Sequence, residues 1–252
     1  MPHPSETSFR NRTFPSRYDM GTQLRYEDAH KHKVNLLFAG HGVEDISADK
    51  ATRKSGTDFL LSPYLSQGQF GEPISCENKF ETHLSGNAAV EFISVDRRNF
   101  TPGWLVTSKA AWLLYWYENG EMLAMFMDEV RKVVFERPGQ FGATTAANKG
   151  YLTWNALEPL ERLARIVDSA RIVNYGKEFG EEPALPSLFS ANLNAKRCSA
   201  DDLVAHMQRY PRSTKPMLVS EEELQAIARH LAPKDRRRVP NKKMRDALSW
   251  LN

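Results

Sequence analysis

The chain has 252 residues, a formal net charge of +3, 41% hydrophobic residues and 26% charged residues. These values exclude a disordered or fibrous chain and allow one large globular domain, alone or with an appendage. The longest apolar run, residues 110–117, is far shorter than the roughly 20 residues that cross a bilayer, and the first residues lack the apolar stretch of a secretory signal. Because its two cysteines, Cys76 and Cys198, lie far apart, we expect a cytoplasmic protein without disulfides and without a membrane partner.

The N-terminal part predicts an irregular segment followed by a helix. Residues 1–18 are polar and contain three prolines, and residues 19–39 have the apolar spacing of a helix that two nearby glycines end. Glu27 falls at the centre of the apolar stripe, where a carboxylate is costly unless it is paired or binds a metal. The alternative interpretation is a carboxylate that reaches the domain edge or pairs with Lys31 one turn on.

The next segments predict a mixed α/β sheet covered by helices, because strands and helices alternate along the chain. Three short apolar stretches predict strands, "TSKAAWLLYWYE" predicts a helix buried on almost every side, and "EMLAMFM" predicts a returning strand before a further helix in "DEVRKVVFER". The predicted strands cover residues 57–62, 74–80 and 88–95, and the buried helix covers residues 107–118.

The C-terminal half predicts mainly helices. Residues 138–195 combine a helix-like stretch, "NALEPLERLARIVDSARIV", with a loop, and we expect them to extend a core formed by residues 19–137. Ser199-x-x-Asp202 and Ser220-x-x-Glu223 have the spacing of helix capping boxes. Residues 196–252 therefore predict a helical region. This region is basic, because its segment "KDRRRVPNKKMR" holds seven basic residues and one acid. We expect the segment either to contact phosphate or to form a solvated tail.

A charged pair shares one face of the predicted strand 74–80. Successive side chains of a strand point to opposite faces, so Ile74, Cys76 and Phe80 predict a core face, whereas Glu77 and Lys79 lie on the other. That second face is either a solvated edge or the floor of a site.

Asp58 enters the preceding strand, so its carboxylate and that of Glu77 can meet if the two strands are neighbours. Two such carboxylates repel each other and raise their own pKa values, whereas a divalent cation favours their ionised forms. Oxygen ligands favour Mg²⁺ or Mn²⁺. The Lys79 ammonium can help to activate a water molecule and offset charge on a phosphoryl transition state.

These residues resemble the PD-(D/E)xK nuclease superfamily, through Asp58 in "GTDFLL" and Glu77-Asn78-Lys79 in "SCENKF". The core of that superfamily runs helix, three strands, helix, strand, with an acid on the second core strand and an acid-x-lysine on the third. "SGNAAVEF" and "TPGWLVTSKAAWLLYW" are similar to small phage and bacterial members, although Thr57 stands where a proline is usual. The resemblance covers about residues 20–135 and implies a restriction-endonuclease-like core.

The resemblance implies a metal-dependent DNA endonuclease. Asp58 and Glu77 would bind Mg²⁺ or Mn²⁺, Lys79 would assist the attacking water, and Glu27 would complete the catalytic set. An inactive nucleic-acid-binding or interaction protein on the same scaffold is one alternative, and an end-processing exonuclease is another. A homodimer is left open.

Other charged residues are candidates for supporting roles. Glu91 has three interpretations: a further metal ligand, a residue that orients water, or a cross-strand partner of Lys79. We expect several scattered basic residues to contact the phosphates of a substrate: Lys109, Arg97, Arg98, Arg236, Arg237, Arg238, Lys242 and Lys243.

Overall fold

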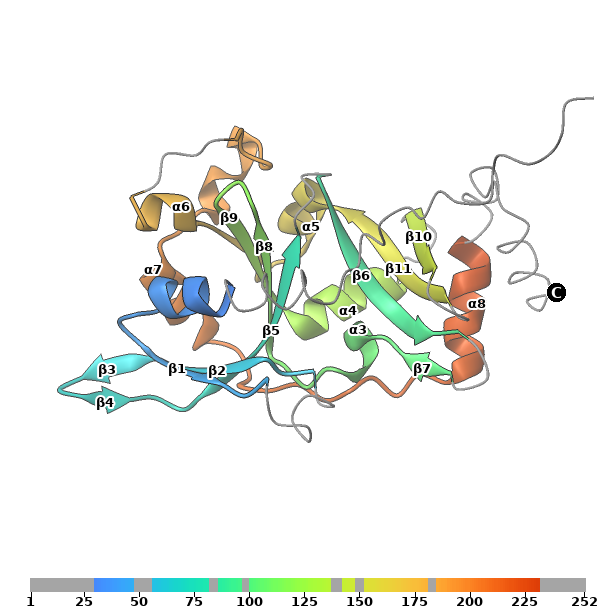
Figure 1. Cartoon of the computed structure of the whole chain (residues 1–252), viewed down its shortest axis with the longest axis horizontal. Helices are drawn as coiled ribbons and strands as arrows, with labels where there is room; N and C mark the ends of the chain where they lie inside the picture. Colours follow the sequence, from blue (N-terminus) through green and yellow to red (C-terminus); the bar gives the residue numbers. More distant parts are fainter. Residues whose placement is uncertain are drawn as a thin grey trace, which may run out of the picture.

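The computed structural model describes residues 30–47, 56–81, 86–96, 100–136, 142–147, 152–180 and 185–231. It is an α/β fold in which helices flank a mixed sheet (Figure 1). Within these ranges, no helix combines the length and the apolar character needed to cross a membrane.

The larger sheet has six strands in the order β1-β2-β5-β8-β9-β12. Its only parallel neighbours are β5 and β8, and every other neighbouring pair is antiparallel. The strands are β1 (Gly42–Asp45), β2 (Phe59–Ser62), β5 (Ile74–Glu81), β8 (Trp112–Tyr117), β9 (Glu121–Phe126) and β12 (Arg171–Asn174).

A second sheet of four antiparallel strands has the order β10-β11-β6-β7. Its strands are β10 (Gly142–Ala147), β11 (Leu152–Pro159), β6 (Asn87–Val95) and β7 (Thr101–Pro102). A separate hairpin of β3 (Tyr64–Ser66) and β4 (Gln69–Phe70) projects from the larger sheet, at the left of Figure 1.

Helices lie on both sides of the larger sheet. Residues 30–37 are helical, and Figure 1 shows them near α7, whereas α4 lies on the side of the second sheet. The remaining helices are α3 (Trp104–Thr107), α4 (Met127–Glu136), α5 (Leu160–Ile166), α6 (Tyr175–Glu178), the 3-10 helix η2 (Ala191–Lys196), α7 (Ala200–Met207) and α8 (Glu221–Leu231).

The central strands of the larger sheet bury both faces. Leu113 and Tyr115 pack into a first core that includes residues of α4, α5 and the second sheet. Trp112 and Leu114 point the other way, into a second core that includes Phe38 and residues of α7. This alternation along β8 is the period of two that a strand imposes on its side chains.

The prediction of a buried helix over residues 107–118 is wrong, because this segment contains strand β8. A strand covered on both faces is a continuous apolar run, which periodicity cannot distinguish from a buried helix. Asn119-Gly120 does not end a helix. It belongs to the turn that joins β8 to β9, where Gly120 has φ +84°, a conformation that favours glycine.

Other element predictions have mixed outcomes. The strands predicted at 57–62, 74–80 and 88–95 are present as β2, β5 and β6, but β6 belongs to the second sheet. The helix expected in residues 138–195 is present as α5, but three strands that the sequence did not predict, β10, β11 and β12, also lie there and join both sheets.

Several other predictions, of one strand and of helices, are confirmed. The strand in "EMLAMFM" and the helix after it are confirmed as β9 and α4. Both capping boxes are confirmed, since the Asp202 amide donates to the Ser199 hydroxyl and the Glu223 amide donates to the Ser220 hydroxyl. Of the helix predicted over 19–39, the described part is helical at 30–37, while residues 1–29 lie outside the described ranges.

Candidate active site

Asp58 is bound to β5 on both sides of Glu77. Its main-chain amide donates to the carbonyl oxygen of Cys76 at 2.9 Å, and its Oδ2 accepts the amide hydrogen of Asn78 at 2.7 Å. Strand β2 begins one residue later, at Phe59, so the Asp58 carboxylate occupies the edge of β5 where the ladder between the two strands ends. The two acids that the sequence pairs are therefore neighbours in the fold.

Glu77 is buried rather than solvated. Its side chain is only 3% exposed, and it lies in register with Leu113 of β8, which belongs to the first core. Burial raises the pKa of Glu77 to about 7; the Lys79 ammonium opposes this rise, and the Asp58 carboxylate adds to it. The interpretation of this face of β5 as a solvated edge is therefore wrong for Glu77, which is a buried acid paired with Lys79.

Lys79 forms an ion pair with Oε1 of Glu77, and its side chain remains 30% exposed. Its Nζ lies 5.2 Å from the centroid of the Trp104 ring. Burial by itself lowers the pKa of Lys79, but the charges of Glu77 and Asp58 together raise it above its usual value. The amine is therefore a cation at neutral pH.

Glu91 is the third acid near Lys79. Burial raises its pKa, while the Lys79 ammonium, the Ser94 hydroxyl and the Trp104 amide act to lower it. The interpretation of Glu91 as a cross-strand partner of Lys79 is wrong, because β6 pairs with β11 and β7 and not with β5. The two residues come together across the two sheets.

Ser108 is a residue of the site that the sequence did not indicate. It follows α3, is fully buried, and its Oγ lies 3.5 Å from Oε2 of Glu77. The same hydroxyl donates to the carbonyl of Gly56, two residues before Asp58, at 2.6 Å. No sequence signal marked this serine, because it lay inside the predicted helix.

Asp58 and Glu77 are the two residues of the predicted set that the structure brings together as possible metal ligands. Among the residues that the structure describes, no group of three or more histidines, cysteines, aspartates or glutamates has the geometry of a metal centre. Glu27 lies outside these residues, so its predicted place in the catalytic set has no structural counterpart here.

Of the predicted substrate contacts, only Lys109 is described, and it is exposed. It precedes β8 and does not lie in a helix, because the helix predicted over residues 107–118 is absent. The other seven lie outside the described ranges: Arg97, Arg98, Arg236, Arg237, Arg238, Lys242 and Lys243.

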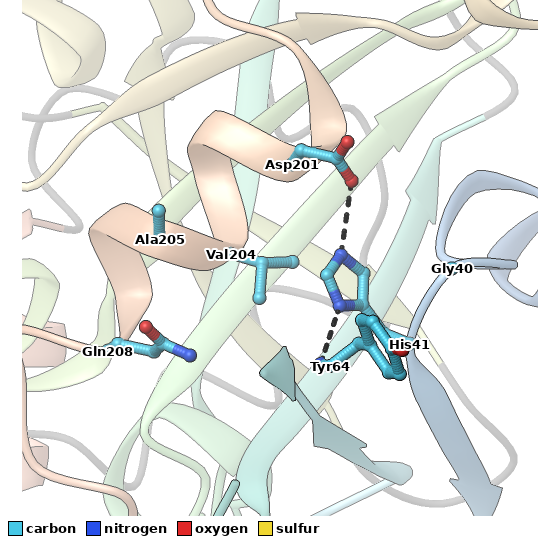
Figure 2. A pocket seen from close by; sticks show the side chains of 7 residues that line it. All are labelled: Gly40, His41, Tyr64, Asp201, Val204, Ala205 and Gln208. Atoms are coloured by element: carbon cyan, nitrogen blue, oxygen red, sulfur yellow. Dashed lines mark hydrogen bonds and ion pairs between the residues drawn. The ribbon is translucent and has the colours of Figure 1, made fainter. Parts of the chain in front are cut away.

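A surface hollow of about 370 Å³ lies away from these acids, between α7 and the start of β1 (Figure 2). Nδ1 of His41 accepts the amide hydrogen of Tyr64 at 3.0 Å, so Nε2 carries the proton and contacts Oδ1 of Asp201 at 3.2 Å. Because both ring nitrogens are engaged, this histidine has no nitrogen available as a general base. Neither Asp58 nor Glu77 lines this hollow.

Comparison with protein-family models, curated proteins and solved structures gives no significant match to the chain.

Proposed function

We propose that the protein is a metal-dependent endonuclease that hydrolyses DNA phosphodiester bonds, with Asp58 and Glu77 as metal ligands and Lys79 beside the attacking water. The observation that carries the proposal is the contact set of Asp58, which joins β5 at residues 76 and 78 and so brings its carboxylate beside Glu77. The ion pair between Glu77 and Lys79 adds the third member of the motif.

The element order supports membership of the PD-(D/E)xK superfamily and a restriction-endonuclease-like core. The helix at residues 30–37 is followed by β1, β2 and β5, which are neighbours in one sheet, and then, after β6 and β7, by α3 and β8. Asp58 immediately precedes the second of these strands, and Glu77 and Lys79 lie on the third. This is the distribution of acids and lysine that defines the superfamily motif.

The charge of the site suits a divalent cation. When ionised, the three acids that interact with the Lys79 ammonium carry three negative charges against its one positive charge. These acids are Asp58, Glu77 and Glu91. Burial is the main cause of the raised pKa of Glu77, the Asp58 carboxylate adds to it, and a bound cation would favour the ionised forms of both acids. A Mg²⁺ or Mn²⁺ ion held by Asp58 and Glu77 would supply Lewis-acid polarisation of the phosphate and a more acidic water.

Lys79 has the properties of a cationic assistant and not of a general base. Its ammonium is held by Glu77 yet is partly exposed, so one face can reach substrate. A protonated amine donates hydrogen bonds that orient the attacking water, and its charge offsets the negative charge that develops on the phosphoryl oxygens. Water adds to phosphorus as one of its protons passes to solvent, and the bond to the leaving oxygen breaks as that oxygen takes up a proton from solvent.

DNA contacts would come from basic residues around this site. Lys109 is exposed and directly follows Ser108, whose hydroxyl contacts Glu77. A lysine in this position can bind a phosphate near the scissile bond. The basic segment 234–245 would add contacts that weaken as salt rises.

The test is cleavage of supercoiled, linear and branched DNA with Mg²⁺, Mn²⁺ or EDTA. We expect nicked or linear products from circular DNA with either metal and none with EDTA. Glu77→Gln and Asp58→Asn, which keep side-chain size but remove a charge, should each lower the rate at least 100-fold. Glu136→Gln, the same change at an exposed acid at the end of α4, is the matched charge control and should cleave like the parent.

The products separate the competing functions. Digestion of linear DNA from its ends, with circular DNA left intact, would replace the endonuclease by an exonuclease. DNA binding without cleavage or metal binding would indicate an inactive scaffold. Equal rates for Glu77→Gln and the parent would show that the proposed centre is not the catalytic one.

A further inference from the structure

Ser108 links two parts of the proposed metal site. Its hydroxyl has one hydrogen, and the short contact, 2.6 Å, goes to the carbonyl of Gly56 on the segment that leads to Asp58. On its other side the same oxygen lies 3.5 Å from Oε2 of Glu77 and accepts the Ala110 amide at 3.1 Å. The Ser108 hydroxyl therefore contacts both the main chain that leads to Asp58 and the carboxylate of Glu77.

The main chain at Gly56 lies directly against Ser108. A Cβ atom built on Gly56 would lie 2.8 Å from both Cα and Cβ of Ser108, which is closer than real contacts allow. Gly56 also has φ +62°, a conformation that favours glycine. The absence of a side chain at this position lets the segment carrying Asp58 approach the serine.

Ser108 is itself held in place by a buried arginine of α4. Arg131 donates from Nε to the carbonyl of Leu105 at 2.7 Å and from Nη2 to the carbonyl of Ser108. Its Nη1 reaches Asp128 at 2.7 Å and the carbonyl of Lys215 at 2.8 Å. The turn after α3 is thus bound to α4 and to a C-terminal segment before it meets the acids.

We propose that Ser108 is the positioning residue of the metal site: with its main chain fixed by Arg131, its hydroxyl holds residues 56–58 beside Glu77, so that Asp58 and Glu77 can bind one divalent cation. The proposal rests on the function proposed above, and it assigns Ser108 no contact with substrate. Groups that orient metal ligands from outside the ligand set typically contribute about 10–100-fold in metal affinity.

The test measures Mn²⁺ affinity by calorimetry on the full chain, together with urea unfolding of the metal-free protein. Ser108→Ala removes one oxygen atom, and Gly56→Ala pushes the Asp58 segment away from the serine, while both keep every charged group. We expect each to weaken Mn²⁺ binding by about 10–100-fold. Two variants are used so that poor folding of one leaves the other to decide.

Ser169→Ala is the matched control, because Ser169 is also fully buried and its hydroxyl also bonds the main chain, accepting the amide of Phe126 at 2.9 Å. It should lose a similar amount of stability and bind Mn²⁺ like the parent. A folded Ser108→Ala or Gly56→Ala protein with the parent's affinity overturns the positioning role, as does an equal loss in Ser169→Ala.

Asp58→Asn separates this inference from the proposed function. If the parent binds Mn²⁺ and Asp58→Asn binds it at least 10-fold more weakly, the proposed metal site is supported. The affinities of Ser108→Ala and Gly56→Ala then decide the role of Ser108. If the parent binds no Mn²⁺, or Asp58→Asn binds it equally well, both the metal site and its positioning residue are overturned.

Discussion

The carboxylate of Glu77 and the ammonium of Lys79 form an ion pair whose two members differ in exposure: the glutamate side chain is 3% exposed and the lysine side chain 30%. The acid is therefore held inside the fold, and the amine bridges it to the surface. In the mechanism that we propose, this asymmetry gives the two residues different roles: Glu77 would bind the metal and Lys79 would face the substrate.

Lys79 should act through its charge. Because the neighbouring acids raise its pKa, Lys79→Met should lower the cleavage rate by about 100–1,000-fold, the typical effect of losing one transition-state contact, whereas Lys79→Arg should retain more activity. The measurement is the single-turnover rate from pH 6 to 9. A rate that rises in this range for the parent and not for Lys79→Arg would instead identify the lysine as the base.

Mn²⁺ binding should depend on pH through Glu77. The ion binds the ionised carboxylate, so below the pKa of about 7 the proton competes, and affinity should fall about tenfold for each pH unit. Above pH 7 the affinity should level off. Calorimetry in buffers of different ionisation enthalpy measures both the affinity and the protons released.

Asp58→Asn provides the comparison for this dependence. It removes one charge that raises the pKa of Glu77, so the pH at which affinity levels off should move down. Equal parent affinities at pH 5.5 and pH 7.5 would contradict the link between Glu77 and the metal.

The charged face of β5 could be predicted because strand geometry is local. Alternation with a period of two placed Cys76 in a core and put Glu77 and Lys79 together, and the structure has the same arrangement. Strand β8 could not be predicted in the same way. Residues 110–117 are apolar at every position, and only the tertiary context decides that both faces of a strand are covered.

The contacts that complete the site are long-range, which is why sequence patterns did not reveal them. Ser108 meets Gly56 across 52 positions and Glu77 across 31, and Arg131 meets Lys215 across 84. No local sequence pattern determines contacts between residues so far apart in the chain. The sequence indicates Glu91 as a candidate but not the sheet that its strand joins, so of its three interpretations only the cross-strand pairing with Lys79 is wrong.

Arg131 should be a major contributor to stability. Arg131→Met would leave the carbonyls of Leu105, Ser108 and Lys215 without this donor, and a buried group left unpaired costs about 1–3 kcal/mol. We expect the free energy of unfolding in urea to fall by about 3 kcal/mol. Arg165→Met is the control: its side chain is 62% exposed and pairs with Glu161, so about 0.5 kcal/mol should be lost.

The main chain of β6 lies so close to Gly103, at the start of α3, that we expect no side chain to fit there. A Cβ there would lie 2.5 Å from the carbonyl oxygen of Glu91, and the Gly103 amide already donates to the carbonyl of Phe92 at 2.9 Å. Since the obstacle is main chain and cannot rotate away, Gly103→Ala should force α3 outward. We expect a loss of about 1–3 kcal/mol in the free energy of unfolding.

Gly40→Ala is the matched change, because a Cβ there meets no atom within 4 Å, and it should alter stability by at most about 0.5 kcal/mol. Moving α3 would also move Ser108, which follows it directly, so Gly103→Ala should weaken Mn²⁺ binding while Gly40→Ala does not. If Gly103→Ala lost stability but kept the parent's affinity, the position of α3 would matter to the fold and not to the two acids.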